Sequence, residues 1–532
     1  MKDEYLRIPC KHNNQKIKLM KSNIIKRNIS LLVTGTALSA VIIVACTKKL
    51  EVTDQNNPTT DSYFKTATEL QQGVNAVYSS LRAGNLMGRE WFFTHDMRGS
   101  ETAPGGAQLE APRAELLKQA SPAPSNSVMS SVWTGAYQMI NRANLVIAQG
   151  PNITDNTALR DVTVGEAEFL RAWAYYELVS QWGDVPVYTE PITTADGYKA
   201  KSPAADVYAH IISDLTDAVA KLPDVQAQQG RATKGAANAL LGRVQMQNGD
   251  YAAAKVALLQ VYGKYSLAPH FSYNFDGDVM VNGVQATAGH EFNSESVFEV
   301  AFYDKGTGGF NWGYTGEGPT ADASTMRSQE YGIIWGNVIP SDQILDEFEA
   351  NDPRYNYTFY ESGDKILTMG GTEPGKALTE GLDMNVAPSN NNGVLKKRVY
   401  RKYSKLDWIN DASNLGSGIN QRVIRYADVL LMLAECEAEI GTPAEAAKYI
   451  NEVRARPDVK MPPVSPTIKE EAIAAVMHER AVELAGEEVN NIDILRWRKK
   501  GYYPSIRPDP KPGQVEFFPI PSSEIAANPL LK

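Results

Sequence analysis

Hydrophobic positions spaced three and four residues apart predict a helical scaffold. The first helix begins at a capping box, Thr66-Ala67-Thr68-Glu69, in which the threonine hydroxyl and the glutamate carboxylate each accept a hydrogen bond from a free backbone amide. Ser202-Pro203 offers a hydroxyl cap and a first-turn proline for a later helix. Four apolar stripes follow helical spacing before residue 265: Leu70, Val74, Val77 and Leu81; Val132, Trp133, Tyr137, Ile140 and Ile147; Ala167, Leu170, Ala174 and Leu178; Val207, Ile211, Leu215 and Val219.

Two segments share a helix–turn–helix pattern. Residues 236–262 contain the turn Gly249-Asp250-Tyr251 and a second helix with Ala254, and residues 426–456 repeat this order around Gly441-Thr442-Pro443 and Ala446. A turn glycine followed five residues later by alanine is typical of tetratricopeptide helix pairs, because the small side chain lets the two helices approach closely. The pattern predicts stacked helical hairpins.

The middle of the chain, about 265–420, has a different composition. Glycine, asparagine and aromatic residues are frequent there, and Ser296–Val300 is a short strand-like piece. The stretches 304–325 and 384–395 are predicted to be long loops, and loops of that length are usually functional or disordered. The fold class predicted is therefore mainly α, with a helical platform at about 61–264 and 421–500, a loop-rich irregular insertion at about 265–420 carrying short strands, and a C-terminal tail at 501–532.

The N-terminus has the features of an export signal. A basic lead precedes the uncharged run Ile29–Ala45, and Ile43-Val44-Ala45-Cys46 is similar to a bacterial lipobox, in which the cysteine is acylated. We therefore expect a signal peptide at 1–45, lipid attachment at Cys46 and a tether at 46–60. Met1 and Met20 are the two candidate start codons. With Cys10 removed and Cys46 acylated, Cys436 would be the one remaining cysteine, so the mature chain could form no intramolecular disulfide.

The charge argues against nucleic acid as a partner. The full chain carries 53 basic and 62 acidic residues, a net charge of −9. Removing residues 1–45 leaves 45 basic against 60 acidic residues, a net charge of −15. An acidic protein repels phosphate backbones.

Catalytic motifs are scarce. The sequence has no HExxH and no paired CxxC, and its small number of histidines, six, argues against a zinc site. Residues 370–377 approach a P-loop, but Ala377 lacks the hydroxyl that would hold magnesium. Leu415-Gly416-Ser417-Gly418 has the small residues of a nucleophile elbow without its spacing. Two carboxylates could still meet in space as in a glycosidase. We expect no catalytic residue, no metal site and no cofactor.

Two predicted loops combine aromatic rings with hydrogen-bonding groups, as a sugar-binding surface requires. The first follows the first helix and contains Trp91, His95, Asp96, Arg98 and Glu101, and the second is the glycine-rich stretch with Phe310, Trp312 and Tyr314. Lesser candidates are Tyr331, Trp335 and Trp408. The alternative is a core position, which we expect for Trp133, Trp173, Trp182 and Trp497 and which stays open for Trp91-Phe92-Phe93.

Several motifs in order resemble those of the SusD/RagB family. They are Gly165–Pro186, Pro340–Arg354 with a solvent-facing helix and an Asp-Pro-Arg turn, Arg425–Glu435, His478–Trp497, and the Pro519-Ile520-Pro521 ending. Ala481 departs from the pattern, where a second arginine is common, as do Glu488 and Val489, where arginine or tyrosine is usual. Lys48-Lys49 also departs, since surface lipoproteins of these bacteria often have acids after the cysteine.

The resemblance implies a SusD-like fold and a surface lipoprotein that captures nutrients, typically oligosaccharides, and passes them to a TonB-dependent, SusC-like outer membrane transporter. The protein would then be no enzyme, with its lipid anchor in the outer membrane. Two other hypotheses remain, a surface glycoside hydrolase and a helical scaffold that binds only protein. The family's helix motifs do not identify the ligand.

Overall fold

The computed structural model describes residues 63–106, 109–281, 284–304, 324–332, 335–366, 380–381, 386–404 and 416–532. Residues 64–532 form one compact unit. The predicted signal peptide at 1–45, Cys46 and the tether at 46–60 lie outside the described residues. Among the residues that are described, no helix combines the length and apolar character needed to cross a bilayer.

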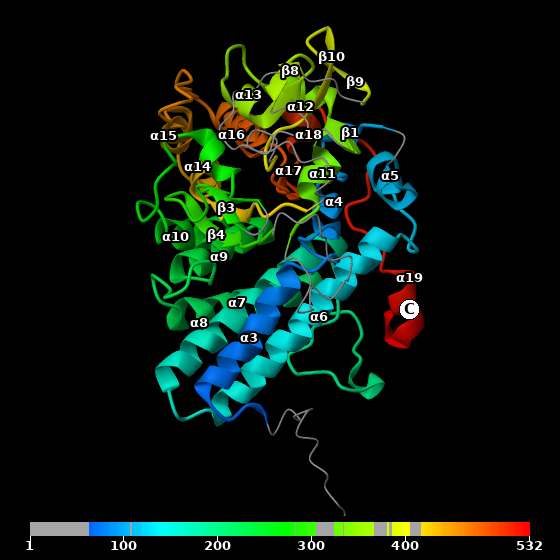
Figure 1. The fold of residues 1–532 in the computed structure, drawn as a ribbon, viewed down its shortest axis with the longest axis vertical. Helices are drawn as coiled ribbons and strands as arrows, with labels where there is room; N and C mark the ends of the chain where they lie inside the picture. The colour runs from blue at the N-terminus through cyan, green and yellow to red at the C-terminus, as the bar shows by residue number, and fades with distance from the viewer. Residues whose placement is uncertain are drawn as a thin grey trace, which may run out of the picture. The chain divides into compact units, whose positions relative to one another are not determined.

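Long helices form the N-terminal part of this unit (Figure 1). They are α3 (Ala67–Leu81), α6 (Ser127–Gln149), α7 (Thr157–Trp182) and α8 (Ala204–Lys221). Helix α7 is the central one, because it packs against α3, α6 and α8. The capping box at Thr66 and Glu69 is confirmed, and the four apolar stripes all lie on these helices. The cap predicted for α8 is wrong: Ser202 does not cap it, and the Ala204 N–H donates instead to Asp184 Oδ1 at 2.8 Å.

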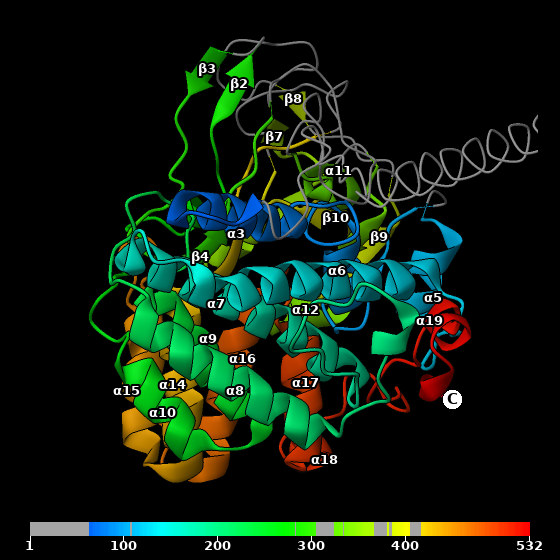
Figure 2. The same ribbon diagram turned by 90° about the horizontal axis from the view of Figure 1, so that it is seen from below.

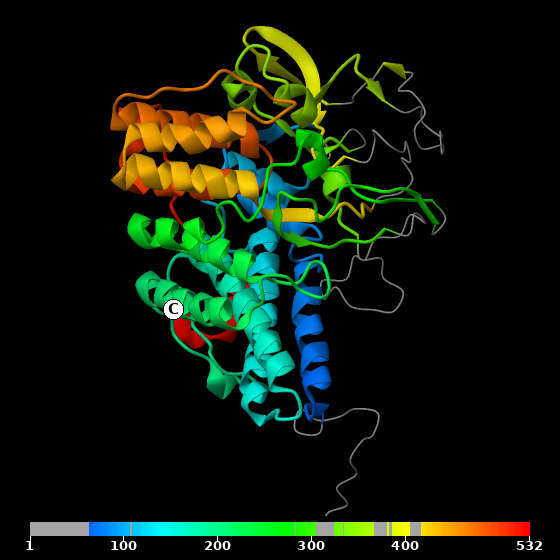
Figure 3. The same cartoon turned by 90° about the vertical axis from the view of Figure 1, so that its left-hand side faces the viewer.

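Helix pairs continue the platform. Helices α9 (Lys234–Asn248) and α10 (Tyr251–Leu259) form one pair, and α14 (Tyr426–Ile440) and α15 (Pro443–Arg454) form another. Helix α10 packs on α14 and joins the pairs, and Figure 3 shows them stacked along one side of the unit. A Cβ at Gly242 would lie 2.5 Å from Leu258 Cγ, so this close approach requires glycine. The two predicted helical hairpins are confirmed.

Further helices complete the described structure. They are α4 (Glu90–Asp96), α5 (Ala111–Lys118), α11 (Arg327–Tyr331), α12 (Asp342–Glu347), α13 (Arg354–Thr358), α16 (Lys469–Leu484), α17 (Asn490–Lys499), α18 (Tyr502–Ser505) and α19 (Ser522–Ala527), with 3₁₀ turns at Gly150–Asn152, Ala195–Gly197, Phe271–Asn274 and Pro529–Leu531. The mainly helical fold with helix-pair scaffold agrees with the prediction.

The strands are short and pair antiparallel. The pairs are β1 (Thr102–Pro104) with β5 (Val338–Pro340), β2 (Val279–Val281) with β3 (Val284–Thr287), β4 (Ser296–Val300) with β11 (Gln421–Arg425), and β7 (Lys365–Ile366) with β8 (Glu380–Gly381). Strands β6 (Phe359–Glu361), β10 (Val394–Tyr400) and β9 (Pro388–Asn391) form a small sheet. Figures 2 and 3 show the β2–β3 and β7–β8 hairpins on the side of the unit away from α10 and α15.

The predicted loop at 384–395 is wrong in its described part. Residues 388–391 and 394–400 form the β9–β10 hairpin, whose two-residue turn is Asn392-Gly393. Both turn residues have positive φ, 47° at Asn392 and 88° at Gly393. Asn-Gly favours this turn because both residues tolerate the left-handed conformation, and its twist matches that of the paired strands.

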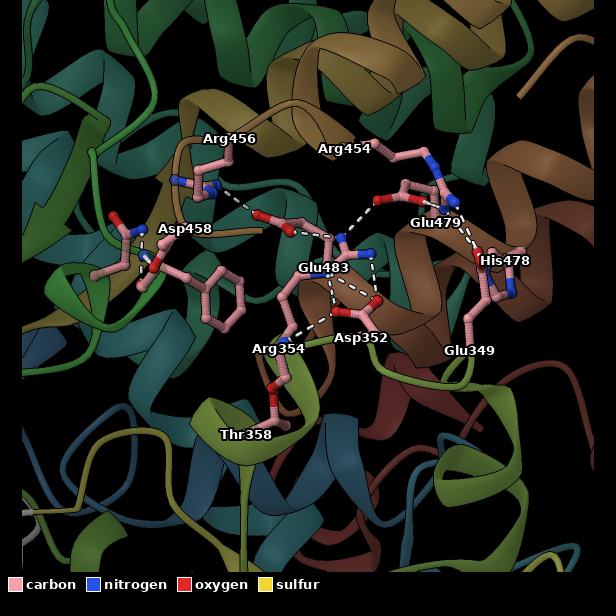
Figure 4. Close-up of polar contacts among 12 residues, drawn as sticks. Glu349, Asp352, Arg354, Thr358, Arg454, Arg456, Asp458, His478, Glu479 and Glu483 are labelled. Atoms are coloured by element: carbon pink, nitrogen blue, oxygen red, sulfur yellow. Dashed lines mark hydrogen bonds and ion pairs between the residues drawn. The ribbon is translucent and has the colours of Figure 1, made fainter. Parts of the chain in front are cut away.

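A buried ion-pair network, here called the α16 network, ties the middle of the chain to the last helices (Figure 4). Its members are Glu295, Asp352, Arg354, Arg425, Arg456, Glu479, Glu483 and Glu487. Arg354, which is fully buried, contacts Glu479 at 2.5 Å and Glu483 at 2.9 Å on α16. The helix expected in Pro340–Arg354 is α12. The Asp-Pro-Arg turn that follows it is directed to the interior, where Arg354 binds Glu479 and Glu483 of α16.

Glu295 shows how the α16 network overcomes the cost of burial. Burial by itself would raise the pKa of this carboxyl, but the guanidinium groups of Arg456 and Arg425 outweigh it and lower the pKa to about 2. Their nitrogens lie 2.6 Å and 2.7 Å from the Glu295 oxygens. Because Glu295 directly precedes β4, the network fixes the segment that carries the candidate site described below.

Candidate functional site

The first predicted binding segment is a buried helix, and its assignment to a loop is wrong. Trp91 lies on α4 and is 4% exposed. Its Nε1–H donates to Glu177 Oε2 at 2.8 Å, and His95 Nε2 lies 2.7 Å from the same oxygen. Phe92 and Phe93 pack against Tyr331. The alternative that Trp91-Phe92-Phe93 is part of the core is confirmed.

Asp96 and Arg98 are buried as well. Asp96 accepts a hydrogen bond from the Tyr331 hydroxyl at 2.7 Å. Burial raises its pKa, which the charge of Arg327 partly offsets. Arg98 donates to the carbonyl of Val515 at 2.7 Å and stacks over Phe518. In this conformation these side chains contact the protein's own interior, so direct contact with a ligand by Trp91, His95, Asp96 or Arg98 stays a prediction.

The other predicted residues divide into two groups. Trp335 is half-buried and Tyr331 is buried. Phe310, Trp312, Tyr314 and Trp408 lie outside the described residues, as does the P-loop-like stretch at 370–377. The core positions expected for Trp133, Trp173, Trp182 and Trp497 are confirmed, since all four are buried.

The described residues that flank the second predicted segment meet each other. Thr325 and Ser417 exchange backbone hydrogen bonds of 2.9 Å and 2.8 Å. A Cβ at Gly418 would lie 2.9 Å from the Asp304 nitrogen, so residues 304 and 325 both lie against 416–418. Met326 N–H donates to the Gly88 carbonyl at 2.9 Å. The turn before α4 and both ends of the 304–325 stretch are therefore neighbours, although they are far apart in sequence.

An exposed ring and several polar side chains adjoin this meeting point. We call them the Tyr303 surface, which comprises Tyr273, His290, Glu291, Tyr303 and Asn420. The side chain of Tyr303 is 45% exposed. Asn420 connects the group, since its Oδ1 accepts from the Phe302 N–H at 2.9 Å and its own N–H donates to Glu291 Oε1 at 2.8 Å. Buried Asn420 thus ties the chain segment that carries the exposed Tyr303 ring to the half-buried carboxyl of Glu291.

His290 is held in one orientation by two neighbours. Its Nδ1 lies 2.6 Å from Asp276 Oδ2, and its backbone N–H donates to Oδ1 of the same carboxylate at 2.9 Å. Because a carboxylate only accepts, this contact places a proton on Nδ1, and Nε2 is the ring nitrogen left for another partner. The Tyr273 ring is stacked on the imidazole, with centroids 3.5 Å apart and planes 6° apart.

Glu291 is a carboxyl group that stays neutral near neutral pH. Burial raises its pKa to about 8, even though Arg422 and the Asn420 N–H act in the opposite direction. A neutral carboxylic acid both donates and accepts hydrogen bonds, which suits an uncharged hydroxyl better than an anion.

Metal and thiol chemistry find no support in the described part of the chain. No group of three or more His, Cys, Asp or Glu side chains there could hold a metal ion. Cys436 is buried in α14, and burial raises the pKa of its thiol. Gly416-Ser417-Gly418 forms part of the bridge to Thr325 and is not a strand-to-helix elbow.

The sequence prediction missed the Tyr303 surface. Tyr273 and Asp276 belong to Phe271–Asp278, a segment of aromatic residues, acids and one glycine, and His290 follows the β2–β3 hairpin. That composition could have marked the segment as a candidate. The pairing of Asp276 with His290 could not be found from the sequence, because the two residues are fourteen positions apart and the chain between them folds back through an irregular hairpin.

Two family models match the chain. A model described as "SusD family" matches residues 294–516, and one described as "Starch-binding associating with outer membrane" matches residues 50–246. Among curated relatives, SusD-like protein P2 of Formosa agariphila is 28% identical over 494 residues, which cover 88% of this chain and 92% of the relative.

Solved structures show the same fold. A SusD superfamily protein from Bacteroides vulgatus aligns with a TM-score of 0.69 at 22% identity, covering 88% of this chain and 99% of that one. A laminarin binding SusD-like protein aligns with a TM-score of 0.65 at 25% identity, covering 87% of this chain and 98% of that one.

Proposed function

This chain belongs to the SusD/RagB family, and on that premise we propose that it is a non-catalytic lipoprotein that binds nutrient oligosaccharides at the outer membrane. It delivers them to a TonB-dependent transporter of the SusC kind. Cys46 carries the lipid anchor, and the protein faces the cell surface. The name of the laminarin-binding relative and the outer-membrane description of one matching family model support this proposal.

The observation that carries the proposal is the convergence of loop ends at the Tyr303 surface. An exposed ring stacks on the apolar C–H face of a pyranose, and neutral acceptors and donors fix its hydroxyls. Tyr303, Glu291 and the Nε2 atom of His290 supply these groups. The predicted residues Phe310, Trp312 and Tyr314 belong to the stretch whose ends lie here, so we propose that they complete the same site. We propose for Trp335 a lesser share of the contact.

Trp91, His95, Asp96 and Arg98 have a second role in this proposal. They are buried in the segment that directly follows the turn at Gly88, which contacts Met326, so we propose that they support the site from the interior. Any direct contact of their side chains with a ligand would require the core to open.

The surface glycoside hydrolase remains the rival. Glu291 and Glu299 both hydrogen-bond to Asn420, and two carboxyls beside one site are the groups that a glycosidase needs. Glu299, however, is 1% exposed and lies 3.3 Å from Arg422, so its carboxylate is already held in an ion pair within the protein. We therefore favour binding without bond cleavage. A protein-only scaffold would leave the exposed ring and the neutral acid without a ligand.

Affinity electrophoresis in gels that contain neutral polysaccharides, laminarin among them, tests the proposal. The unmodified protein should be retarded by at least one polysaccharide, and the double variant Tyr303→Ala/Trp312→Ala should lose about tenfold or more in affinity. Tyr198→Ala, another exposed tyrosine, is the matched control and should bind normally. Retardation that is unchanged in the double variant would reject this site.

Two further measurements separate the rivals. New reducing ends after incubation with the retained polysaccharide would establish the hydrolase instead. Copurification of a large outer-membrane barrel, without retardation by any polysaccharide, would favour the protein-only scaffold.

A further inference from the structure

A groove of about 530 Å³ lies between the loop that joins α8 to α9, the residues after α10 and the segment that leads into β4. Figure 1 shows α9, α10 and β4 as neighbours. We propose that this groove, here called the Phe292 groove, is a second saccharide-binding site separate from the Tyr303 surface. The inference rests on the proposed function for the class of ligand, and on the groove's own chemistry for the site.

The lining of the Phe292 groove mixes rings with uncharged polar groups. Tyr265 and Phe292 contribute the rings, and Gln228, Gln229 and Ser294 contribute amides and a hydroxyl. The volume falls within the range of about 300–1,000 Å³ that is typical of ligand sites. Rings beside several amides and hydroxyls can hold a pyranose by its apolar face and its hydroxyls together.

The charged groups of the lining already have protein partners. Arg231 contacts both oxygens of Glu166 at 3.1 Å and donates to Asn75 at 2.6 Å. Glu299 lies beside Arg422, and Lys264 lies 3.6 Å from Asp224. The groups left for a ligand are therefore mostly uncharged, which favours a neutral, hydroxyl-rich molecule over an anion or a basic peptide.

Phe292 adopts a strained backbone conformation. Its φ is +52°, a left-handed value that a bulky side chain rarely adopts. Such conformations cost on the order of 1–3 kcal/mol and persist where the surrounding structure enforces them, often at binding sites. Here the Phe292 N–H donates to Glu299 Oε1 at 2.7 Å, which fixes the turn. The strain places the ring in the groove wall beside Gly230.

The frame of the Phe292 groove is built from fixed elements. Glu299 belongs to β4, which pairs with β11, and Glu295 belongs to the α16 network. On the opposite wall the Thr233 hydroxyl caps α9 and lies 3.4 Å from the Tyr265 hydroxyl. Since both walls are held in place, a ligand would not have to pay for ordering them.

One short segment serves both proposed sites. Glu291 contacts Asn420 on the Tyr303 surface, whereas Phe292, the next residue, lines the groove. A polysaccharide long enough to reach both would bind the second site at a high effective concentration. Long chains should therefore bind more tightly than short ones, by more than the number of sugar units explains.

Ser294→Arg tests the Phe292 groove, because Ser294 is exposed and a long side chain there fills the groove without disturbing the core. Ser523→Arg, at an exposed serine of α19, adds the same charge elsewhere and is the matched control. Phe292→Ala is the second variant, and its thermal unfolding is compared with that of the unmodified protein before binding is measured.

The probe is laminarin, together with five other neutral polysaccharides, in affinity gels. On the polysaccharide that retards the protein, Ser294→Arg and folded Phe292→Ala should each weaken binding at least threefold. Combination with Tyr303→Ala/Trp312→Ala should abolish it, while Ser523→Arg binds normally. If Ser294→Arg binds as the unmodified protein does while Tyr303→Ala/Trp312→Ala does not, the groove proposal is overturned and the proposed function stands. If no polysaccharide retards the unmodified protein, both are overturned.

Discussion

The α16 network and the Tyr303 surface use the same kinds of side chain in opposite ways. In the network, arginines and carboxylates are buried and compensate one another, as Arg425 does with Glu295, Glu483 and Glu487. At the Tyr303 surface, Glu291 keeps its proton and the ring of Tyr303 is half exposed. Saturated groups hold a fold together, whereas groups with spare hydrogen-bonding capacity and open faces can receive a ligand.

Two aromatic residues, Trp91 and Tyr303, show the same contrast. Trp91 gives its N–H to Glu177 and packs against Trp173, so its bonding capacity is used inside the protein. Tyr303 exposes its ring beside loop ends that converge from three parts of the chain. Residue type alone therefore does not separate a binding aromatic from a core aromatic. The difference is whether the ring and its hydrogen-bonding group already have partners inside the protein.

The largest loss of stability is expected when an arginine of the α16 network is replaced by an uncharged residue. Arg425→Met leaves three buried carboxylates short of a partner, and such a loss costs about 3–5 kcal/mol in the free energy of unfolding. The denaturation midpoint measures it. Lys396→Met is the matched control, because Lys396 forms an exposed pair with Glu361 and its loss costs about 1 kcal/mol or less. Equal midpoints for the two variants would contradict the structural role of the network.

Trp91→Ala should separate stability from binding. Removing a buried indole opens a cavity and leaves Glu177 without one donor, so the free energy of unfolding should fall by about 3 kcal/mol. Retardation in polysaccharide gels, measured well below the unfolding midpoint, should stay close to that of the unmodified protein. A folded Trp91→Ala protein that no longer binds would instead support the prediction that Trp91 contacts the ligand.

The smallest effect on the free energy of unfolding is expected for a substitution of Glu291, and this effect depends on pH. The folded state keeps a proton that the unfolded chain releases near its ordinary pKa of 4.5, while the folded pKa is about 8. The Glu291 contribution is therefore fully present below about pH 4.5 and is lost as the pH rises toward 8.

Glu291→Gln cannot ionise and should remove this part of the pH dependence. At pH 8 the variant should exceed the unmodified protein in the free energy of unfolding by about 1–3 kcal/mol, and near pH 4 the two should agree. Denaturant titrations across this range provide the measurement. Parallel pH profiles would show that Glu291 is ionised in the folded protein.

The helical half of the fold followed from local signals. The Thr66–Glu69 capping box, the apolar stripes and the two glycine turns with Ala254 and Ala446 predicted their helices, because hydrogen bonds and packing within a helix connect residues three to five positions apart. The Asn392-Gly393 hairpin carried an equally local signal that was overlooked within a stretch rich in asparagine.

The candidate site was predicted in part. The stretch around Trp312 was singled out by its rings and glycines, and the described ends of that stretch do meet at an exposed aromatic surface. The stretch around Trp91 has the same composition but lies in the core. Its environment depends on Glu177 and Tyr331, which come from distant parts of the chain, so no local pattern could distinguish the two.

By itself, the sequence determined the helices, their pairing into hairpins and the resemblance to a family, since these depend on short-range spacing and on motifs carried in order. Only the tertiary structure decided which charged and aromatic side chains are buried with protein partners, and which keep an exposed ring face or a free hydrogen-bonding atom at the surface. The physical reason is that burial and pairing arise from contacts between residues up to hundreds of positions apart, such as Arg327 with Glu488 or Arg98 with Val515.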